Sequence, residues 1–298
     1  MPKHTLISRL LAVAAALTFV ATLAAQQPPA PQPDPANLEV QKVNDNVYVV
    51  KGGGGNTTVF LTSRGAVVTD FKNPGWGNAL LAKIKTFTDK PVTTVINTHS
   101  HADHVGGNVD LPASVEIVSH EDTKQQMARM DAFKTSNGRG MPTRTFSDRL
   151  TLGTGADRIE LYSFGPGQTS GDIWVVFPAG RTVATGDVFG LKNPTRIDTE
   201  NGGSASRVAE TIEKAVAGIK NVDNVVTGHG DVVPWRDLEE YARFNRLFLN
   251  DVRAALAQGK TPDEIAAAWK VPTGYTGYTA APARIKENAQ KVAEETKR

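Results

Sequence analysis

The sequence of 298 residues contains no cysteine, so it can form no disulfide bond and carries no cysteine-linked lipid anchor. The stability of the fold must therefore come from packing or from bound metal. Lysine and arginine form no continuous run, which argues against a nucleic-acid partner. The sequence also lacks a serine nucleophile elbow, because Gly-Gly-Ser-Ala-Ser at 202–206 has the pattern of a helix start. These absences exclude a disulfide-linked scaffold and a serine hydrolase.

An apolar run at residues 10–25 is 16 residues long, whereas a helix that crosses a bilayer needs about 20. Lys3 and Arg9 precede this run and small residues stand at its end, as in a secretory signal peptide. We therefore predict a signal peptide at residues 1–25 and a periplasmic or secreted protein without a stable membrane anchor after cleavage. A retained membrane anchor is the alternative.

Residues 26–37 are rich in proline and predict an extended linker. We predict a single domain over residues 38–298, in which 235–298 are mainly helical. These C-terminal helices either pack on the domain or form a dimer interface. Loss of the signal peptide would remove Lys3 and Arg9 but no acidic residue, and would lower the formal net charge from +2 to 0. A neutral mature chain again gives no sign of a nucleic-acid partner.

Segments with strand character alternate with segments of helical periodicity, which predicts an α/β fold. The predicted strands lie at 47–50, 57–62, 66–70, 93–98, 115–119, 158–164, 172–178, 181–187 and 224–228. The predicted helices lie at 77–87, 121–133, 204–219 and 235–256, with a capping box that begins a further helix at Thr261. Residues 134–148 are polar and predict a surface loop.

Four of the six histidines follow predicted strands. His99, His101 and His104, with Asp103 between them, come directly after the strand at 93–98, and His229 follows the strand at 224–228. Loops at strand ends are where rigid scaffolds present ligands, and imidazole and carboxylate are ligands that suit zinc. The pattern therefore predicts a metal site.

Two aspartates, Asp70 and Asp187, also stand at strand ends. Each alone has the character of a turn residue. Beside the histidines they become candidates for a bridging carboxylate or for a partner that fixes the orientation of a ligating imidazole. His120 also follows a strand but lies outside this set, and we interpret it as the start of a helix.

The sequence His99-Ser-His101-Ala-Asp103-His104, with Asp70 before it and Asp187 and His229 after it, resembles the metallo-β-lactamase superfamily over residues 38 to 236. The resemblance implies an αββα four-layer sandwich, here with a C-terminal helical extension. It also implies one site made of His99, His101 and a third histidine, and a second site made of Asp103, His104 and His229. Asp187 would bridge the two sites and Asp70 would support a ligand. The implied cofactor is one or two zinc ions, with iron or manganese as alternatives.

The third histidine of the first site is missing. In Phe-Gly-Pro-Gly-Gln-Thr-Ser-Gly-Asp at 164–172, Gln168 stands where the family pattern has histidine. An amide oxygen is a harder and weaker ligand for zinc than an imidazole nitrogen. Three states follow from this change: two metals with the first weakened, one metal in the second site, or none.

The resemblance further implies hydrolysis by a metal-activated water, with Asp187 or Asp103 passing a proton to the leaving group. The absence of cysteine excludes the thiolate-containing second site of the family, and Gln168 argues against the sulfur dioxygenases, which use a single iron in the first site. Thioesterases of the glyoxalase II type share Asp187, but glutathione thioesters are cytoplasmic. Export therefore favours a small cyclic amide or ester, such as a β-lactam or a lactone.

Lys192 follows Asp187 by five residues and either receives a substrate carboxylate or is an ordinary surface lysine. The contrasting function is that of a degenerate member of the family, which binds a ligand or a partner without turnover. Gln168 favours that reading, whereas the six other ligand-type residues favour an enzyme.

Overall fold

The computed structural model describes residues 33–297. The predicted signal peptide and residues 26–32 of the predicted linker lie outside this range. The linker's last residues, Pro35–Asn37, form the short 3-10 helix η1. No helix among residues 33–297 is both long and apolar enough to cross a membrane.

The first sheet has seven strands in sequence order. Their bounds are β1 Glu39–Lys42, β2 Val47–Lys51, β3 Thr57–Leu61, β4 Ala66–Thr69, β5 Val92–Ile96, β6 Glu116–His120 and β7 Arg144–Phe146. Strands β1 to β4 pair antiparallel, and β4 to β7 pair parallel. The carboxyl ends of β4, β5 and β6 therefore meet at one edge of the sheet.

The second sheet has six strands in the order β13-β12-β11-β10-β9-β8. Their bounds are β8 Arg149–Leu152, β9 Ile159–Tyr162, β10 Trp174–Phe177, β11 Thr182–Ala184, β12 Asn224–Val226 and β13 Val232–Pro234. Only β11 and β12 pair parallel. Their carboxyl ends thus lie side by side, and the chain continues from them to Asp187 and to His229.

Side chains on alternate positions of the strands build separate cores, as the two-residue period of a strand requires. Val175 and Phe177 of β10 join Val47 and Phe60 of the first sheet in a core between the sheets. Trp174 of β10 faces the other way and packs with the helices of the C-terminal half. The two sheets are therefore stacked face to face.

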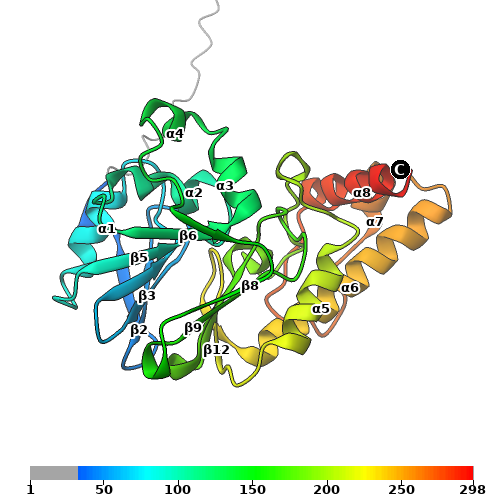
Figure 1. Ribbon diagram of the computed structural model, residues 1–298. Coiled ribbons are helices and arrows are strands. Elements are labelled where there is room, and N and C mark those ends of the chain that lie inside the picture. The colour runs from blue at the N-terminus through cyan, green and yellow to red at the C-terminus, as the bar shows by residue number, and fades with distance from the viewer. Residues whose placement is uncertain (1–32, 298) are drawn as a thin grey trace, which may run out of the picture. The chain divides into compact units, whose positions relative to one another are not determined.

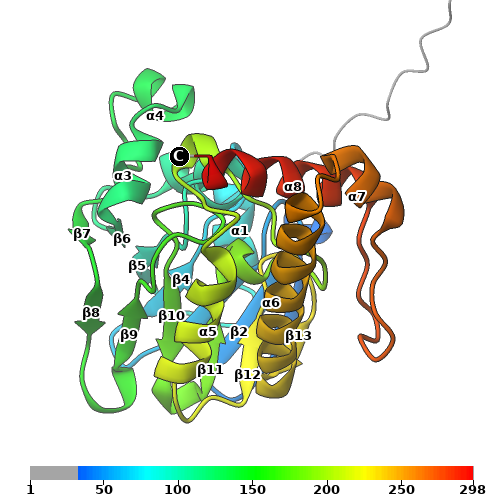
Figure 2. The same cartoon turned by 90° about the vertical axis from the view of Figure 1, so that its right-hand side faces the viewer.

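Helices cover both outer faces of the stacked sheets (Figures 1 and 2). Helix α1, Gly77–Ile84, packs on the outer face of the first sheet through Leu80 and Ile84. The outer face of the second sheet is covered by α5, Val208–Gly218, and α6, Trp235–Ala257. This arrangement is the expected αββα four-layer sandwich.

The C-terminal extension continues from α6 with α7, Pro262–Ala268, and α8, Pro282–Thr296. The predicted capping box is present, with Thr261 and Glu264 bonded to each other's backbone. Buried side chains of both helices, including Ile265, Ile285 and Val292, join the same core as α5 and α6. Within one chain these helices therefore pack on the domain.

Two local predictions were wrong. The predicted helix at 121–133 is two helices, α3 Glu121–Met127 and α4 Asp131–Thr135, because Met130 has an extended backbone. The break lets Met127 and Phe133 reach one buried cluster, whereas a continuous helix would point them to different sides. The predicted loop at 134–148 contains β7, which adds a strand beside β6.

Candidate metal centre

The predicted ligand residues converge where the strand ends of the two sheets meet. His99 follows β5, and Asp103 and His104 lie on the single-turn helix α2, Ala102–Val105. Asp187 lies on the 3-10 turn η5, Gly186–Phe189, after β11, and His229 follows β12. The convergence follows from the topology, because parallel neighbours end at the same edge.

One half of the centre consists of Asp103, His104 and His229, with Asp187 beside them. The Nε2 atoms of His104 and His229 lie 3.3 Å apart. Oδ2 of Asp103 lies 3.2 Å from Nε2 of His229, and Oδ1 of Asp187 lies 3.2 Å from the same atom. Oδ1 of Asp187 is also 3.3 Å from Nε2 of His104. Two imidazole nitrogens and two carboxylate oxygens thus face one point.

The other half consists of His99, His101 and Gln168. His99 and His101 can offer ligand atoms within 4.8 Å of a carboxylate oxygen of Asp187 and of each other. The side chain of Gln168 is buried, and its Nε2 donates a hydrogen bond to Oδ2 of Asp187 at 3.3 Å. Gln168 therefore lies beside Asp187, the residue expected to bridge the two sites.

Polar atoms of this centre are buried without a hydrogen-bond partner. They are Nε2 of His99 and Oε1 of Gln168. Oδ1 of Asp187 is also buried, 3.3 Å from Nε2 of His104 and 3.2 Å from Nε2 of His229. Burying an unsatisfied polar atom is costly, and a coordinated cation would satisfy all three at once. The donor set of imidazole and carboxylate also fits zinc, so the residues present fit a metal.

The histidines of the two halves differ in their protonation. Burial lowers the pKa of His99 well below its usual value, and the like charges of His104 and His101 lower it further. Burial alone would lower the pKa of His104 too, but the charges of Asp70 and Asp187 hold it well above the usual value. Hydrogen bonds to Asp103 and Asp187 raise the pKa of His229 to about 9. The pKa of His99 is thus lowered, whereas the pKa values of His104 and His229 are raised by the carboxylates around them.

Both acids of the centre are ionised. Burial would raise the pKa of Asp187, but the charge and hydrogen bond of His104 hold it well below the usual range. Burial also acts to raise the pKa of Asp103. The hydrogen bond to His229 and the charge of His104 outweigh burial, so the pKa of Asp103 lies well below its usual value. Both carboxylates are therefore ready to bind a cation.

Asp70 supports His104 from behind. Its Oδ2 lies 2.7 Å from Nδ1 of His104 and accepts a hydrogen bond from the hydroxyl of Thr98, and its Oδ1 accepts one from the Thr98 backbone. This arrangement leaves Nε2 of His104 for the centre. Thr98 also contacts Nδ1 of His99 at 3.0 Å. Thr98 was not predicted from the sequence, where it is one more polar residue before the motif.

A second supporting carboxylate, Asp198, was also missed. Its Oδ2 lies 2.8 Å from Nε2 of His101. Burial would raise the pKa of Asp198, but hydrogen bonds from Asn201 and His101 lower it below the usual value. Asp198 lies 97 residues from His101 in a stretch with no motif, so the sequence carried no signal for it.

Two glycines allow the backbone to approach the ligands closely. A Cβ atom on Gly55 would lie 2.2 Å from Cε1 of the His104 ring, and one on Gly228 would lie 2.0 Å from Oδ1 of Asp187. Neither position can carry a larger residue without moving a ligand. The backbone itself therefore bounds the centre on two sides.

Lys72 holds the glycine segment that contains Gly55. Its side chain is fully buried, and Nζ donates hydrogen bonds to the carbonyls of Val50 at 2.6 Å and Gly55 at 2.7 Å. Burial lowers the pKa of Lys72 to about 7, although the charges of Asp70 and Asp103 act to raise it. Lys72 thus ties the end of β2 to the segment that packs on His104.

Two other residues considered in the sequence lie outside this cluster. Lys192 forms an ion pair with Asp237 at 2.7 Å and lies over the ring of Tyr278, so a role in binding a substrate carboxylate remains a prediction. His120 accepts a hydrogen bond from the backbone of Asp122 and caps α3, in keeping with its interpretation as a helix start.

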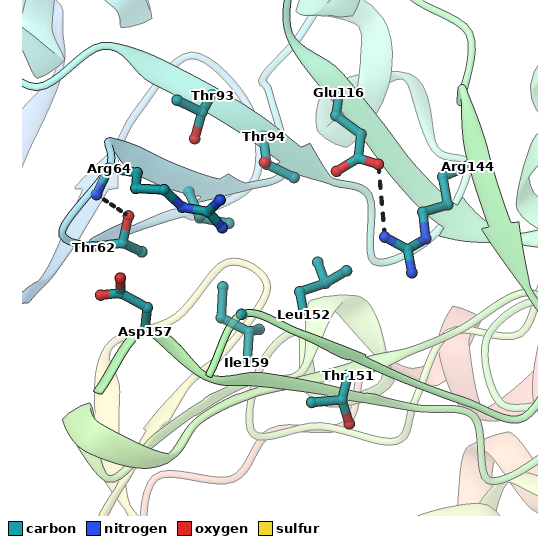
Figure 3. A pocket seen from close by; sticks show the side chains of 12 residues that line it. Thr62, Arg64, Thr93, Thr94, Glu116, Arg144, Thr151, Leu152, Asp157 and Ile159 are labelled. Atoms are coloured by element: carbon teal, nitrogen blue, oxygen red, sulfur yellow. Dashed lines mark hydrogen bonds and ion pairs between the residues drawn. The ribbon is translucent and has the colours of Figure 1, made fainter. Parts of the chain in front are cut away.

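A cavity of about 400 Å³ lies at the opposite end of the strands. Figure 3 shows Thr93 and Thr94, near the start of β5, and Arg144, which points toward Glu116 and forms an ion pair of 3.8 Å with it. None of the described residues that line this cavity is a histidine. The candidate metal ligands therefore lie away from this cavity, at the other end of the strands.

Two relatives of known sequence resemble the chain. The 2,4-dinitroanisole O-demethylase subunit alpha of Nocardioides sp. (strain JS1661) is 30% identical over 165 residues, which cover 52% of this chain and 49% of that protein. The chain thus spans about half the length of that relative. The metallo-beta-lactamase type 2 of Bacillus cereus is 26% identical over 210 residues, which cover 65% of this chain and 77% of that protein.

Many solved structures share the fold. A metallo-beta-lactamase from Pontibacter korlensis superposes with a TM-score of 0.60 at 23% identity, over 70% of this chain and 99% of that one. The inverting sec-alkylsulfatase Pisa1 from Pseudomonas sp. superposes with a TM-score of 0.70 at 16% identity, over 87% of this chain and 50% of that one. At these identities the likeness is one of fold.

The family assignment rests on the match across the metal centre. Residues 44–229, more than half of the chain, match the model of the metallo-beta-lactamase superfamily. This range begins before β2 and ends at His229, so it contains every predicted ligand. The chain therefore belongs to the metallo-beta-lactamase superfamily.

Proposed function

We propose that the protein is an exported metal-dependent hydrolase that acts on a small cyclic amide or ester, such as a β-lactam or a lactone. The observation that carries the proposal is the cluster of two imidazole nitrogens and two carboxylate oxygens formed by Asp103, His104, Asp187 and His229. These four residues would hold one metal ion. His99, His101 and Gln168 would hold a second and weaker ion that shares Asp187.

The ion that fits this donor set is zinc, with iron or manganese as alternatives. When bound, such an ion lowers the pKa of a coordinated water to about 7 and polarises the oxygen of the bond to be cleaved. The protein fixes the ligands for this chemistry: Asp70 aligns His104 and Asp198 aligns His101. A neutral His99 needs to lose no proton before it binds.

The chain also supplies an acceptor for the proton that passes to the leaving group. Asp103 and Asp187 are both ionised, but the side chain of Asp103 is 31% exposed, whereas that of Asp187 is 13% exposed. A substrate therefore reaches Asp103 more readily. We assign proton transfer to Asp103 and the joining of the two halves to Asp187.

The relatives and the N-terminus support the proposed substrate class. The metallo-beta-lactamase type 2 of Bacillus cereus acts, by its name, on a cyclic amide, and the match covers most of that protein. The predicted signal peptide would place the enzyme in the periplasm or outside the cell, where such substrates are met. A thioesterase of the glyoxalase II type remains the further alternative, which predicts activity on glutathione thioesters.

One observation favours a second candidate, a binding protein without turnover. The amide of Gln168 donates a hydrogen bond to Oδ2 of Asp187. A metal-bound histidine in place of Gln168 would leave this oxygen free to bind the metal. If this hydrogen bond prevents metal binding, the protein keeps the fold and the polar residues of the centre but cannot carry out metal-dependent hydrolysis. The protein would then bind a small ligand at the same edge of the sheets.

The deciding experiment measures metal content and hydrolysis together. Elemental analysis of the protein without residues 1–25, beside Gln168→His, is combined with assays on a chromogenic cephalosporin and a simple lactone. The proposal predicts at least one firmly bound ion and hydrolysis by the native protein. A native protein that is metal-free and inert, beside a variant that gains metal, would show that Gln168 has switched the enzyme off.

A further inference from the structure

The loop at residues 195–206 contacts the weaker half of the metal centre at two points. Asp198 holds Nε2 of His101, which leaves Nδ1 of that imidazole available for a metal. The backbone N–H of Asp198 donates to the carbonyl of Gln168 at 2.8 Å. Gly203 also packs on this carbonyl, since a Cβ there would lie 1.9 Å from it. The loop therefore sets the positions of both His101 and Gln168.

Helix α8 holds this loop through three side chains on one face. Nδ2 of Asn288 donates to the carbonyl of Thr195 at 2.9 Å, and Nζ of Lys291 donates to the carbonyl of Ile197. The carboxylate of Glu295 accepts hydrogen bonds from the Ser204 hydroxyl at 2.7 Å and from the N–H groups of Ala205 and Ser206 at 2.8 and 3.0 Å.

These three residues follow the spacing of one helical stripe, i, i+3 and i+7. A neighbouring stripe of the same helix, with Ile285, Ala289 and Val292, is buried in the core. The apolar stripe therefore packs α8 on the core, whereas each residue of the polar stripe bonds to the loop, and Lys291 pairs with Glu287 as well. Helix α8 also lies beyond residue 229, where the match to the family ends.

We propose that α8 is a positioning element of the metal centre: Asn288, Lys291 and Glu295 fix the 195–206 loop, so that Asp198 orients His101 for metal binding. The inference rests on the proposed function, because it assigns α8 to the same centre. Partners that orient a ligating histidine typically change metal affinity about 10–100-fold. A residue that acts through such a partner should have a smaller effect.

The test compares Glu295→Ala with Glu294→Ala in the full-length chain. Glu294 is the preceding residue of the same helix and is exposed, so the control carries the same chemical change without the loop contacts. Two further variants extend the test. Asp198→Ala removes the orienting group directly. Glu295→Gln keeps one acceptor oxygen, so its effect should be smaller than that of Glu295→Ala.

The first readout is the imidazole ¹⁵N–¹H spectrum of His101 in the metal-free protein. We expect a single form protonated at Nε2 in the wild type and in Glu294→Ala, and a broadened or mixed signal in Glu295→Ala. The second readout is Co²⁺ titration followed by its visible spectrum. The second ion should bind about 3–10-fold more weakly in Glu295→Ala and about 10–100-fold more weakly in Asp198→Ala.

An identical His101 spectrum in Glu295→Ala and Glu294→Ala would overturn the proposal, as would equal affinities for the second ion. If the wild type takes up a single ion, the spectrum alone decides. A wild type that binds no metal and hydrolyses nothing contradicts the proposed function. In that case a changed His101 spectrum in Glu295→Ala still supports the positioning role of α8.

Discussion

The two halves of the metal centre use the same kinds of elements but offer a cation different surroundings. Asp103, His104 and His229 present ionised or ionisable groups that already interact with one another and with Asp187. His99, His101 and Gln168 include a neutral imidazole and an amide, and atoms of two of them are buried without a partner. One half therefore carries balancing charge, whereas the other does not.

The difference shows where affinity should reside. A cation in the half that contains His229 replaces protons and lies next to the carboxylates of Asp103 and Asp187. A cation in the half that contains His99 has only the shared carboxylate of Asp187 and the weaker amide oxygen of Gln168. We therefore expect sequential binding, with the half that contains His229 filled first.

The largest effect is expected from His229→Ala, which removes a ligand of the stronger half. Metal affinity should fall by more than about 100-fold, beyond what loss of a supporting residue costs, and hydrolysis should fall with it. Equilibrium dialysis measures the affinity. His120→Ala is the control, because that histidine caps α3 and does not face the centre, so it should keep its metal.

A smaller loss is expected from Asp70→Asn, which acts on His104 directly and on His99 only through Thr98. The amide cannot accept all the hydrogen bonds that Asp70 takes from Thr98 and His104, so the imidazole loses its fixed orientation. The first ion should bind about 10–100-fold more weakly. Equal loss for both ions, measured by titration, would contradict the separation of the halves.

The pH dependence should differ between the halves. His229 has a pKa of about 9 without metal, so below pH 9 an incoming ion must displace its proton. The apparent affinity of the first ion should therefore fall about tenfold per pH unit for each proton displaced as the pH drops from 8.5 to 6.5. The second ion displaces no proton from the neutral His99 or from Gln168 and should show a shallower slope.

Calorimetry in two buffers of different ionisation enthalpy counts the released protons directly. Release on binding of the first ion at pH 7, with less on the second, would support the assignment. No release at either step would mean that His104 and His229 are already neutral in the free protein.

The smallest effect is expected from Lys192→Ala. Asp237 already neutralises this ammonium, so its loss should change the KM for an anionic substrate by no more than about threefold. Neither metal half should respond. A KM increase of tenfold or more, with unchanged metal content, would make Lys192 a substrate contact in spite of its ion pair.

The clustering of the candidate ligands could be predicted because strand ends can be recognised locally. The histidines and aspartates follow runs rich in β-branched residues, and parallel pairing of β4 with β5 and of β11 with β12 brings the ends of these runs together. Gln168 was placed through the resemblance of its glycine-rich turn to the family pattern. The sandwich was likewise an expectation from that resemblance, and alternation along β10 explains its inner and outer faces.

The sequence could not predict contacts that depend on distant loops. Asp198 meets His101 because α8, the backbone of Gln168 and Gln126 of α3 hold the loop, and none of these contacts is local. The break at Met130 was missed for a related reason, since burial of Met127 and Phe133 in one cluster outweighs helical periodicity. Three-residue strands such as β7 are too short to show a period.

The reactivity of the buried amine of Lys72 can be used to measure local opening of the protein. With a pKa of about 7, the amine is largely uncharged and nucleophilic at pH 8, yet its side chain has 0% exposure. An acylating reagent can reach it only when the end of β2 separates from the glycine segment at Gly55. The acylation rate of this one residue, read by mass spectrometry, therefore records how often the backbone beside His104 opens.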